Sequence, residues 1–115
     1  MNVTQAIQEA TNRIRVIPFG NGYQVIRPYY GLNADDRATT CSNSMTFSMA
    51  LVHCRNTRIT EVFDAVTGDR EAATDLRYEM ECTGYGDGED WRTVVRRAIL
   101  EYNERKTALP SLIIQ

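Results

Sequence analysis

The stretch Asp90 to Arg105, DWRTVVRRAILEYNER, is the clearest amphipathic helix in the sequence, and we take it as the element around which the chain folds. Its apolar residues recur every three or four positions, which is the spacing of one buried helix face. That face consists of Trp91, Val94, Val95, Ala98, Ile99 and Tyr102. Arginine and glutamate side chains lie off it, so one helix offers both a core surface and charged groups for a ligand.

The composition is that of one folded domain. The chain has 115 residues, of which 43% are apolar and 24% are charged, so we expect a single domain over 1–115. The net charge of -2 gives no general attraction to duplex nucleic acid or to acidic membranes. No apolar run reaches the roughly 18 residues that span a bilayer. The N-terminal segment lacks the basic end and apolar core of a signal peptide, which predicts a cytoplasmic protein without membrane partners.

The first third of the chain predicts a helix followed by a β-hairpin. The helix has an apolar stripe, and Asn2 or Thr4 can cap its start. Two β-rich runs follow, 15–19 and 23–27, separated by Gly-Asn-Gly, which suits a tight turn. Pro18 and Pro28 cannot donate a backbone hydrogen bond, so we expect one side of the hairpin to be a sheet edge. The helical stripe is Val3, Ala6, Ile7, Ala10 and Ile14.

A long apolar helix is predicted in the middle of the chain. Turn-forming residues precede it, with a possible third strand from Arg37 to Cys41. Ser44 is the predicted cap of a helix from Met45 to Val66, which Gly68 ends in the left-handed conformation. So much apolar surface predicts a helix that is central to the fold and also packed against a second subunit. Its predicted face is Met45, Met49, Val52, Ile59, Val62, Phe63 and Val66, widened by Phe47, Leu51 and Cys54.

The last third predicts two more helices. Asp69 can cap a shorter one that runs through Met80, and a glycine-rich loop leads from it into the helix of 90–105. We expect Pro110 to break the helical pattern and the apolar tail 112–114 to dock onto the domain or a neighbouring subunit. The resulting fold class is α+β, with a small antiparallel sheet, the hairpin plus a possible third strand, packed with three to four helices.

Catalytic and metal-binding signatures are missing from the sequence. No serine nucleophile elbow, paired catalytic carboxylates or metal motif occurs, so we expect no enzyme, no cofactor and no metal. Cys41, Cys54 and Cys82 are too widely spaced for a zinc cluster. His53 and Cys54 are adjacent on a predicted helix, where neighbouring side chains point apart and cannot form a catalytic pair.

The glycine loop 84–90, GYGDGED, has two interpretations. Closely spaced glycines before a helix can bind phosphate through backbone N–H groups. However, Asp87, Glu89 and Asp90 place negative charge where the phosphate would lie. Acidic residues in a first helical turn complement the helix dipole, which favours a helix-capping loop.

Two groups of basic residues suggest an anionic ligand. Arg92 and Arg96 lie four apart on one helix face, a like-charge pair that either a phosphate or nearby carboxylates would compensate. At the end of the hairpin, Arg27 precedes Tyr29 and Tyr30. Arginine binds phosphate in bidentate geometry and tyrosine stacks on a base, although the same group is also typical of a β-edge aromatic cluster.

The order of elements resembles small proteins carried by phages and mobile elements, and most of all the Thoeris anti-defence family of cyclic-nucleotide sponges. The resemblance covers nearly the whole chain in layout: a short helix, the hairpin RVIPFGNGYQV, a long helix near MTFSMAL and a final helix with WRTVVRRAI. It implies a non-catalytic oligomer that sequesters a cyclic ADP-ribose signal, and in some members cyclic oligonucleotides, in pockets between subunits.

The leading hypothesis is therefore a small homo-oligomer that binds and sequesters an anionic nucleotide immune signal in the host cytoplasm. Two alternatives remain open: a protein-protein inhibitor of a host defence complex, and a small nucleotide-processing enzyme that would have to use His53 and a few carboxylates. The predicted ligand contacts are three arginines for phosphate, two tyrosines for stacking and one asparagine for a polar contact, namely Arg27, Arg92, Arg96, Tyr29, Tyr30 and Asn33.

Overall fold

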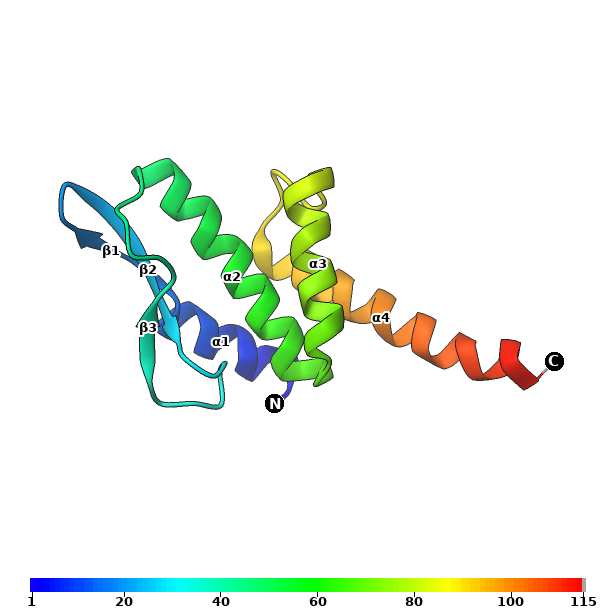
Figure 1. The fold of residues 1–115 in the computed structure, drawn as a ribbon. Coiled ribbons are helices and arrows are strands. Elements are labelled where there is room, and N and C mark those ends of the chain that lie inside the picture. The colour runs from blue at the N-terminus through cyan, green and yellow to red at the C-terminus, as the bar shows by residue number, and fades with distance from the viewer. Residues whose placement is uncertain (115) are drawn as a thin grey trace.

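The computed structural model describes the backbone of residues 1–114 and the side chains of residues 1–107. Over these residues, four helices and a three-stranded antiparallel sheet form the predicted α+β fold (Figure 1). None of the helices within this range is long and apolar enough to cross a membrane. In chain order the elements are α1 (Val3–Arg13), β1 (Arg15–Phe19), β2 (Gly22–Pro28), β3 (Arg37–Thr39), α2 (Phe47–Thr67), α3 (Arg70–Thr83) and α4 (Trp91–Ile114).

The sheet is built on the predicted hairpin. Phe19 pairs with Gly22, so two residues form the turn, and Gly20 begins it with a φ of 58° that only glycine adopts easily. The strand order is β1-β2-β3, which makes β1 an edge strand and leaves the missing N–H of Pro18 without consequence. The predicted third strand is confirmed, although it ends at Thr39.

Local capping signals set most helix boundaries where the sequence predicts them. The Asn2 side chain accepts a hydrogen bond from the first turn of α1, and the Asp69 side chain does the same for α3. Gly68 ends α2 in the left-handed conformation, with a φ of 69°. These interactions are made within a few residues, which is why the sequence alone reveals them.

Helix α2 is the centre of the fold. It contacts α1, α3, α4 and the first two strands. Figure 1 shows it crossing the middle of the molecule, with the sheet and α1 on one side and α3 and α4 on the other. Its buried residues Ile59, Val62 and Phe63 form one hydrophobic core with the buried residues of α1 and with Val25 of β2.

The start of α2 differs from the prediction. The helix begins two residues later than predicted, and its cap is Thr46, which accepts from the backbone N–H three residues on, at 3.2 Å. Met45 pairs instead with Tyr23 of β2, and the Ser44 hydroxyl donates to the Phe19 carbonyl at 3.1 Å. Pairing with the sheet therefore prevents the helix from starting at Met45.

The first turns of the predicted apolar face of α2 lie outside the core of this chain, and their packing against a second subunit stays a prediction. Met49 and Val52 are 59% and 57% exposed, and Phe47 and Leu51 are also exposed. Figure 1 shows these turns beside the sheet but away from α1 and α4, so the helices that bury the later turns do not cover them. We refer to Phe47, Met49, Leu51 and Val52 as the α2 patch.

The predicted face of α4 is confirmed as part of the core. Trp91, Val94, Val95, Ala98 and Ile99 are buried. Tyr102 is half-buried, with its ring edge-to-face against Phe63 of α2 at a centroid distance of 5.4 Å. This face holds α4 against α2.

Helix α4 continues to Ile114, so the prediction that Pro110 breaks it is wrong. A proline inside a helix loses one backbone hydrogen bond and its ring clashes with the carbonyl four residues before, so the helix continues here against the usual effect of proline. Figure 1 shows the end of α4 pointing away from the other elements. The backbone of the predicted apolar tail, 112–114, belongs to this end; its side chains lie outside the described residues, and its docking stays a prediction.

Candidate functional site

A cavity of about 430 Å³ opens between the end of β2 and the facing sides of α2 and α3. This volume lies within the range of small-molecule sites, about 300–1,000 Å³. Three arginines and two carboxylates lie in its walls. The lining residues are Arg27 from β2, Thr57, Thr60 and Glu61 from α2, and Arg70, Thr74, Arg77, Tyr78 and Glu81 from α3.

The orientation of α3 about its own axis places its polar side chains along one wall of the cavity. Two stripes run along this helix at helical spacing, one apolar and one polar, and burial of the apolar stripe turns the polar one towards α2. The apolar stripe is Ala73, Leu76 and Met80, and the polar stripe is Arg70, Thr74, Arg77 and Glu81.

Arg77 is held in place by three side chains. Its Nε donates to Glu81 Oε1 at 2.9 Å and its Nη1 donates to Thr57 Oγ1 at 3.1 Å. Its Nη2 donates to His53 Nδ1 at 2.9 Å. A guanidinium has five N–H donors, so two remain for a ligand. The group is therefore oriented before any ligand arrives.

His53 is a neutral acceptor in this arrangement. Arginine can only donate, so Nδ1 of His53 accepts and its ring proton is assigned to Nε2. Burial lowers the pKa of His53, and the positive charge of Arg77 lowers it further. The Glu81 charge opposes this shift, whereas Arg27 adds to it. The positive charges of Arg27 on β2 and Arg77 on α3 thus both lower the pKa of this imidazole.

Arg27 lies at the β2 end of the cavity. Its Nη1 donates to the carbonyls of Pro28 and Tyr29, at 3.1 and 3.4 Å. Within residues 1–107 its Nε and Nη2 have no hydrogen-bond partner. Arg27 therefore presents unused donors at the cavity that Arg77 also lines, whereas Arg77 already has Glu81 as its carboxylate partner.

Glu61 forms the buried wall of the cavity and is 5% exposed. Its Oε1 accepts from Arg70 Nη1 at 3.1 Å, and the same Nη1 reaches Asp64 Oδ2 at 3.3 Å. Its Oε2 is buried and has no hydrogen-bond partner among the described residues. The cavity thus combines N–H donors for an anion with an unused acceptor.

One of the predicted contact residues lines this cavity, and three more lie on the loop that follows β2. Arg27 lines the cavity, and Tyr29 and Tyr30 follow on the adjoining loop. Their rings lie edge-to-face with centroids 4.5 Å apart, and both are exposed. Asn33 is exposed on the same loop. The loop also contacts the cavity wall, because Gly31 lies beside Glu61.

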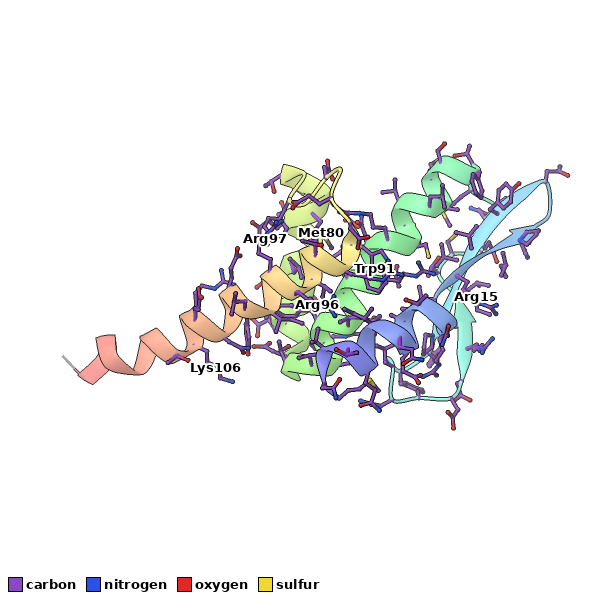
Figure 2. All side chains as sticks on the ribbon, turned by 180° about the vertical axis from the view of Figure 1, so that it is seen from behind. Arg15, Met80, Trp91, Arg96, Arg97 and Lys106 are labelled. Atoms are coloured by element: carbon purple, nitrogen blue, oxygen red, sulfur yellow. The ribbon has the colours of Figure 1, made fainter. Side chains whose placement is uncertain are left out.

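The other two predicted contacts lie elsewhere, because no lining residue of the cavity comes from α4. The Arg92 guanidinium lies 5.1 Å from the centre of the Trp91 ring and 3.7 Å from Asp90 Oδ2. Figure 2, a view from behind, shows Arg96 on α4, where its side chain is exposed. Their contact with a ligand stays a prediction.

Polar groups of the glycine loop form hydrogen bonds with other residues of the protein. The Asp90 side chain accepts from the Arg92 backbone N–H at 2.8 Å, near the start of α4. Arg97 binds both oxygens of Glu89, at 2.7 and 2.8 Å, and this interaction lowers the pKa of Glu89. Arg55 donates to the Gly86 carbonyl. These contacts are those of a helix-capping loop.

Another hollow suits an anion less well. A cavity of about 260 Å³ between α3 and α4 is lined by Asp75, Glu79 and Glu101, and among its described lining residues Arg105 is the basic one. Carboxylates so close to each other would repel a phosphate. The arginine-rich cavity between β2, α2 and α3 is therefore the better candidate.

The sequence prediction missed Glu61, Arg70, Arg77 and Tyr78. A signal for α3 was present, since Arg70 and Arg77 lie seven residues apart and thus on one helix face. No local signal marks Glu61, because its burial depends on α3 and on the loop after β2. A search of protein-family models, curated proteins and solved structures found no match to this chain.

Proposed function

We propose that this chain is a small homo-oligomeric protein that binds an anionic nucleotide signal in the cavity between β2, α2 and α3. It sequesters the signal without turnover. The resemblance to the Thoeris anti-defence family supplies the biological role: a phage protein that removes a cyclic ADP-ribose or cyclic oligonucleotide signal from the host cytoplasm.

The carrying observation is that Arg27 and Arg77 line the same cavity from two elements, β2 and α3. Glu81 also lines this cavity and forms an ion pair with Arg77. A phosphate would balance the remaining positive charge and accept the unused N–H donors of both arginines. Charge-assisted hydrogen bonds of this kind are about twice as strong as neutral ones.

Aromatic side chains support a nucleotide over a simple anion. Tyr78 lines the cavity and is 70% exposed, so its ring is free to stack on a base. Tyr29 and Tyr30 lie on the neighbouring loop. A cavity of about 430 Å³ suits a mononucleotide or cyclic ADP-ribose better than a cyclic oligonucleotide, parts of which would extend beyond it.

Calorimetric titration tests the proposal. The ligands are cyclic ADP-ribose variants and cyclic di- and trinucleotides, and the variants are Arg27→Ala and Arg77→Ala. We expect each variant to weaken binding by about tenfold or more, the effect of losing a charge-assisted hydrogen bond. Intact ligand recovered after denaturing the complex would support sequestration.

Arg15→Ala is the matched control, because Arg15 is exposed on the edge strand β1 (Figure 2) and does not line the cavity. Its affinity should equal that of the wild type. A loss of affinity in Arg92→Ala or Arg96→Ala, with Arg77→Ala unaffected, would move the site to α4. A folded wild type that binds none of these ligands would overturn the proposal.

A second candidate function, inhibition of a host defence complex through protein contact, is favoured by the α2 patch. Four exposed apolar side chains on one helix start are typical of a surface that another protein covers. Val52→Asp should then abolish binding of a defence complex and leave nucleotide binding unchanged. If the protein binds a nucleotide and Val52→Asp does not change its binding to host proteins, sequestration remains the function.

A further inference from the structure

The buried carboxylate of Glu61 is the feature that the anion-binding proposal leaves unexplained. Its Oε1 is paired with Arg70, but its Oε2 is buried without a hydrogen-bond partner among the described residues. A buried acceptor in this state destabilises the fold, so such groups are rare unless something compensates them.

Neighbouring groups do not supply the missing donor. Arg70 Nη1 has two N–H bonds, and these are shared between Glu61 Oε1 and Asp64 Oδ2. On the opposite side lies Gly31, so close that a Cβ built there would be 3.3 Å from Oε2. The loop after β2 thus covers this oxygen without pairing with it.

Glu61 is the charged acceptor on the α2 wall of the cavity, beside two threonine hydroxyls. The Thr60 hydroxyl donates to the Asn56 carbonyl at 2.7 Å, and the Thr57 hydroxyl accepts from Arg77 at 3.1 Å. The last torsion of a glutamate is soft, so rotation of the carboxylate can turn either oxygen towards the cavity. A ligand there would meet a carboxylate in need of a donor.

We propose that Glu61 accepts hydrogen bonds from the ribose hydroxyl groups of a ribonucleotide whose phosphates lie against Arg27 and Arg77. This inference rests on the proposed function and adds the sugar that the site selects. Two vicinal hydroxyls match the two oxygens of a carboxylate, a recognition that carboxylates also make in dinucleotide-binding folds. Arg70 already balances the charge of Glu61, so a neutral donor suits the site better than a second cation.

The test compares three probes by calorimetry: ADP, 2′,3′-dideoxy-ADP and inorganic pyrophosphate. The wild type should bind ADP about tenfold or more tightly than dideoxy-ADP, because a site built around a hydrogen bond rejects the analogue that lacks it. In Glu61→Met, which removes both acceptor oxygens, this ratio should fall to near one, with the affinity for dideoxy-ADP retained. Asp64→Asn is the control, since it removes the other carboxylate from Arg70 and should keep the wild-type ratio.

The outcomes separate this inference from the proposed function. Equal binding of ADP and dideoxy-ADP by the wild type overturns sugar recognition but leaves the anion site standing, and this needs no variant to fold. A wild-type ratio in a folded Glu61→Met also overturns it. Failure of all three probes to bind the wild type also overturns the ribose inference, whereas the titration with cyclic nucleotides decides the proposed function separately.

Discussion

At the scale of single residues, Gly31 is the point where the loop after β2 lies closest to the buried carboxylate of Glu61. Gly31 has a φ of 87°, and a Cβ there would lie 3.3 Å from Glu61 Oε2. Gly31→Ala adds both backbone strain and a close contact. We therefore expect urea denaturation to show a loss of about 1–3 kcal/mol in the free energy of unfolding.

Gly68→Ala is the matched control for this prediction. Gly68 has a similar φ of 69°, but a Cβ built on it meets nothing within 4 Å. Its substitution should cost only the left-handed strain, about 1 kcal/mol. A loss at Gly31 no larger than that at Gly68 would contradict the close contact with Glu61.

His53 predicts how stability depends on pH. Burial and Arg77 lower its pKa below the ordinary value of 6.5, so the folded protein keeps the imidazole neutral where the unfolded chain would protonate it. Stability is fully present above pH 6.5 and is lost as the pH falls from there through the lower folded pKa. Urea unfolding at pH 7.5 and at about 5.5 should show this loss.

The substitution His53→Gln checks the assignment, because His53 is the single histidine in the chain. The variant should lose the pH dependence between those two conditions. The lowered pKa values of Asp69 and Glu89 act in a separate window, below about pH 4. A slope near pH 6 that survives in His53→Gln would contradict the role of the imidazole.

Sequence reasoning reached some residues of the site and not others. Arg27 was predicted because a cation beside two tyrosines is a local pattern. Glu61 was not, because a glutamate in a long helix is usually exposed, and only its contacts with α3 and Gly31 bury it. Arg92 was predicted as a phosphate contact from spacing alone, whereas the structure places its guanidinium against Trp91.

At the scale of elements, the start of α2 carries a prediction. The Thr46 side chain caps the helix, whereas Ser44 donates to a strand carbonyl. Thr46→Ala should lower the free energy of unfolding by about 1 kcal/mol in chemical denaturation, because a backbone N–H of the first turn loses its acceptor. Ser44→Ala should lower the free energy of unfolding by less. A larger loss in Ser44→Ala than in Thr46→Ala would instead support the helix start at Met45 that the sequence predicts.

Helix and strand boundaries followed from the sequence where local chemistry sets them. The caps at Asn2 and Asp69, the Gly68 terminus and the Gly20 turn are all made by residues close in the chain. The start of α2 could not be found this way, because Met45 pairs with Tyr23 of another element. Pairing across the fold overrides local preference there.

At the scale of the whole molecule, the α2 patch predicts assembly. The protein is elongated, measuring 59 × 30 × 21 Å, and the patch exposes four apolar side chains at the start of α2. Light scattering after size-exclusion chromatography should give a mass above that of one chain. Val52→Asp should reduce it towards the monomer, because a buried charge without a partner opposes association.

Leu100→Asp is the comparison variant, because Leu100 is also exposed but belongs to α4. It should leave the mass unchanged if the α2 patch is the interface. Dissociation by Leu100→Asp with no effect of Val52→Asp would assign the interface to α4. A monomer at high concentration in the wild type would contradict assembly through either surface.

The fold class was predictable at this scale, since helical and strand periods mark each element. Which surfaces of these elements contact one another could not be predicted from the sequence. The sequence left open whether the basic groups near Arg27 and on α4 form one site. In the structure, Arg27 shares its cavity with Arg70 and Arg77 of α3. The apolar residues at the start of α2 looked like core because periodicity cannot show where neighbouring helices end.

The central claim, that an anionic nucleotide binds between β2, α2 and α3, is tested most directly by NMR on isotope-labelled protein. Titration with cyclic ADP-ribose should shift the side-chain Nε–H signals of Arg27 and Arg77 together with the backbone amides around Glu61. The signals of Arg92 and Arg96 should stay in place. Shifts confined to α4, with the Arg27 and Arg77 signals unchanged, would contradict this account.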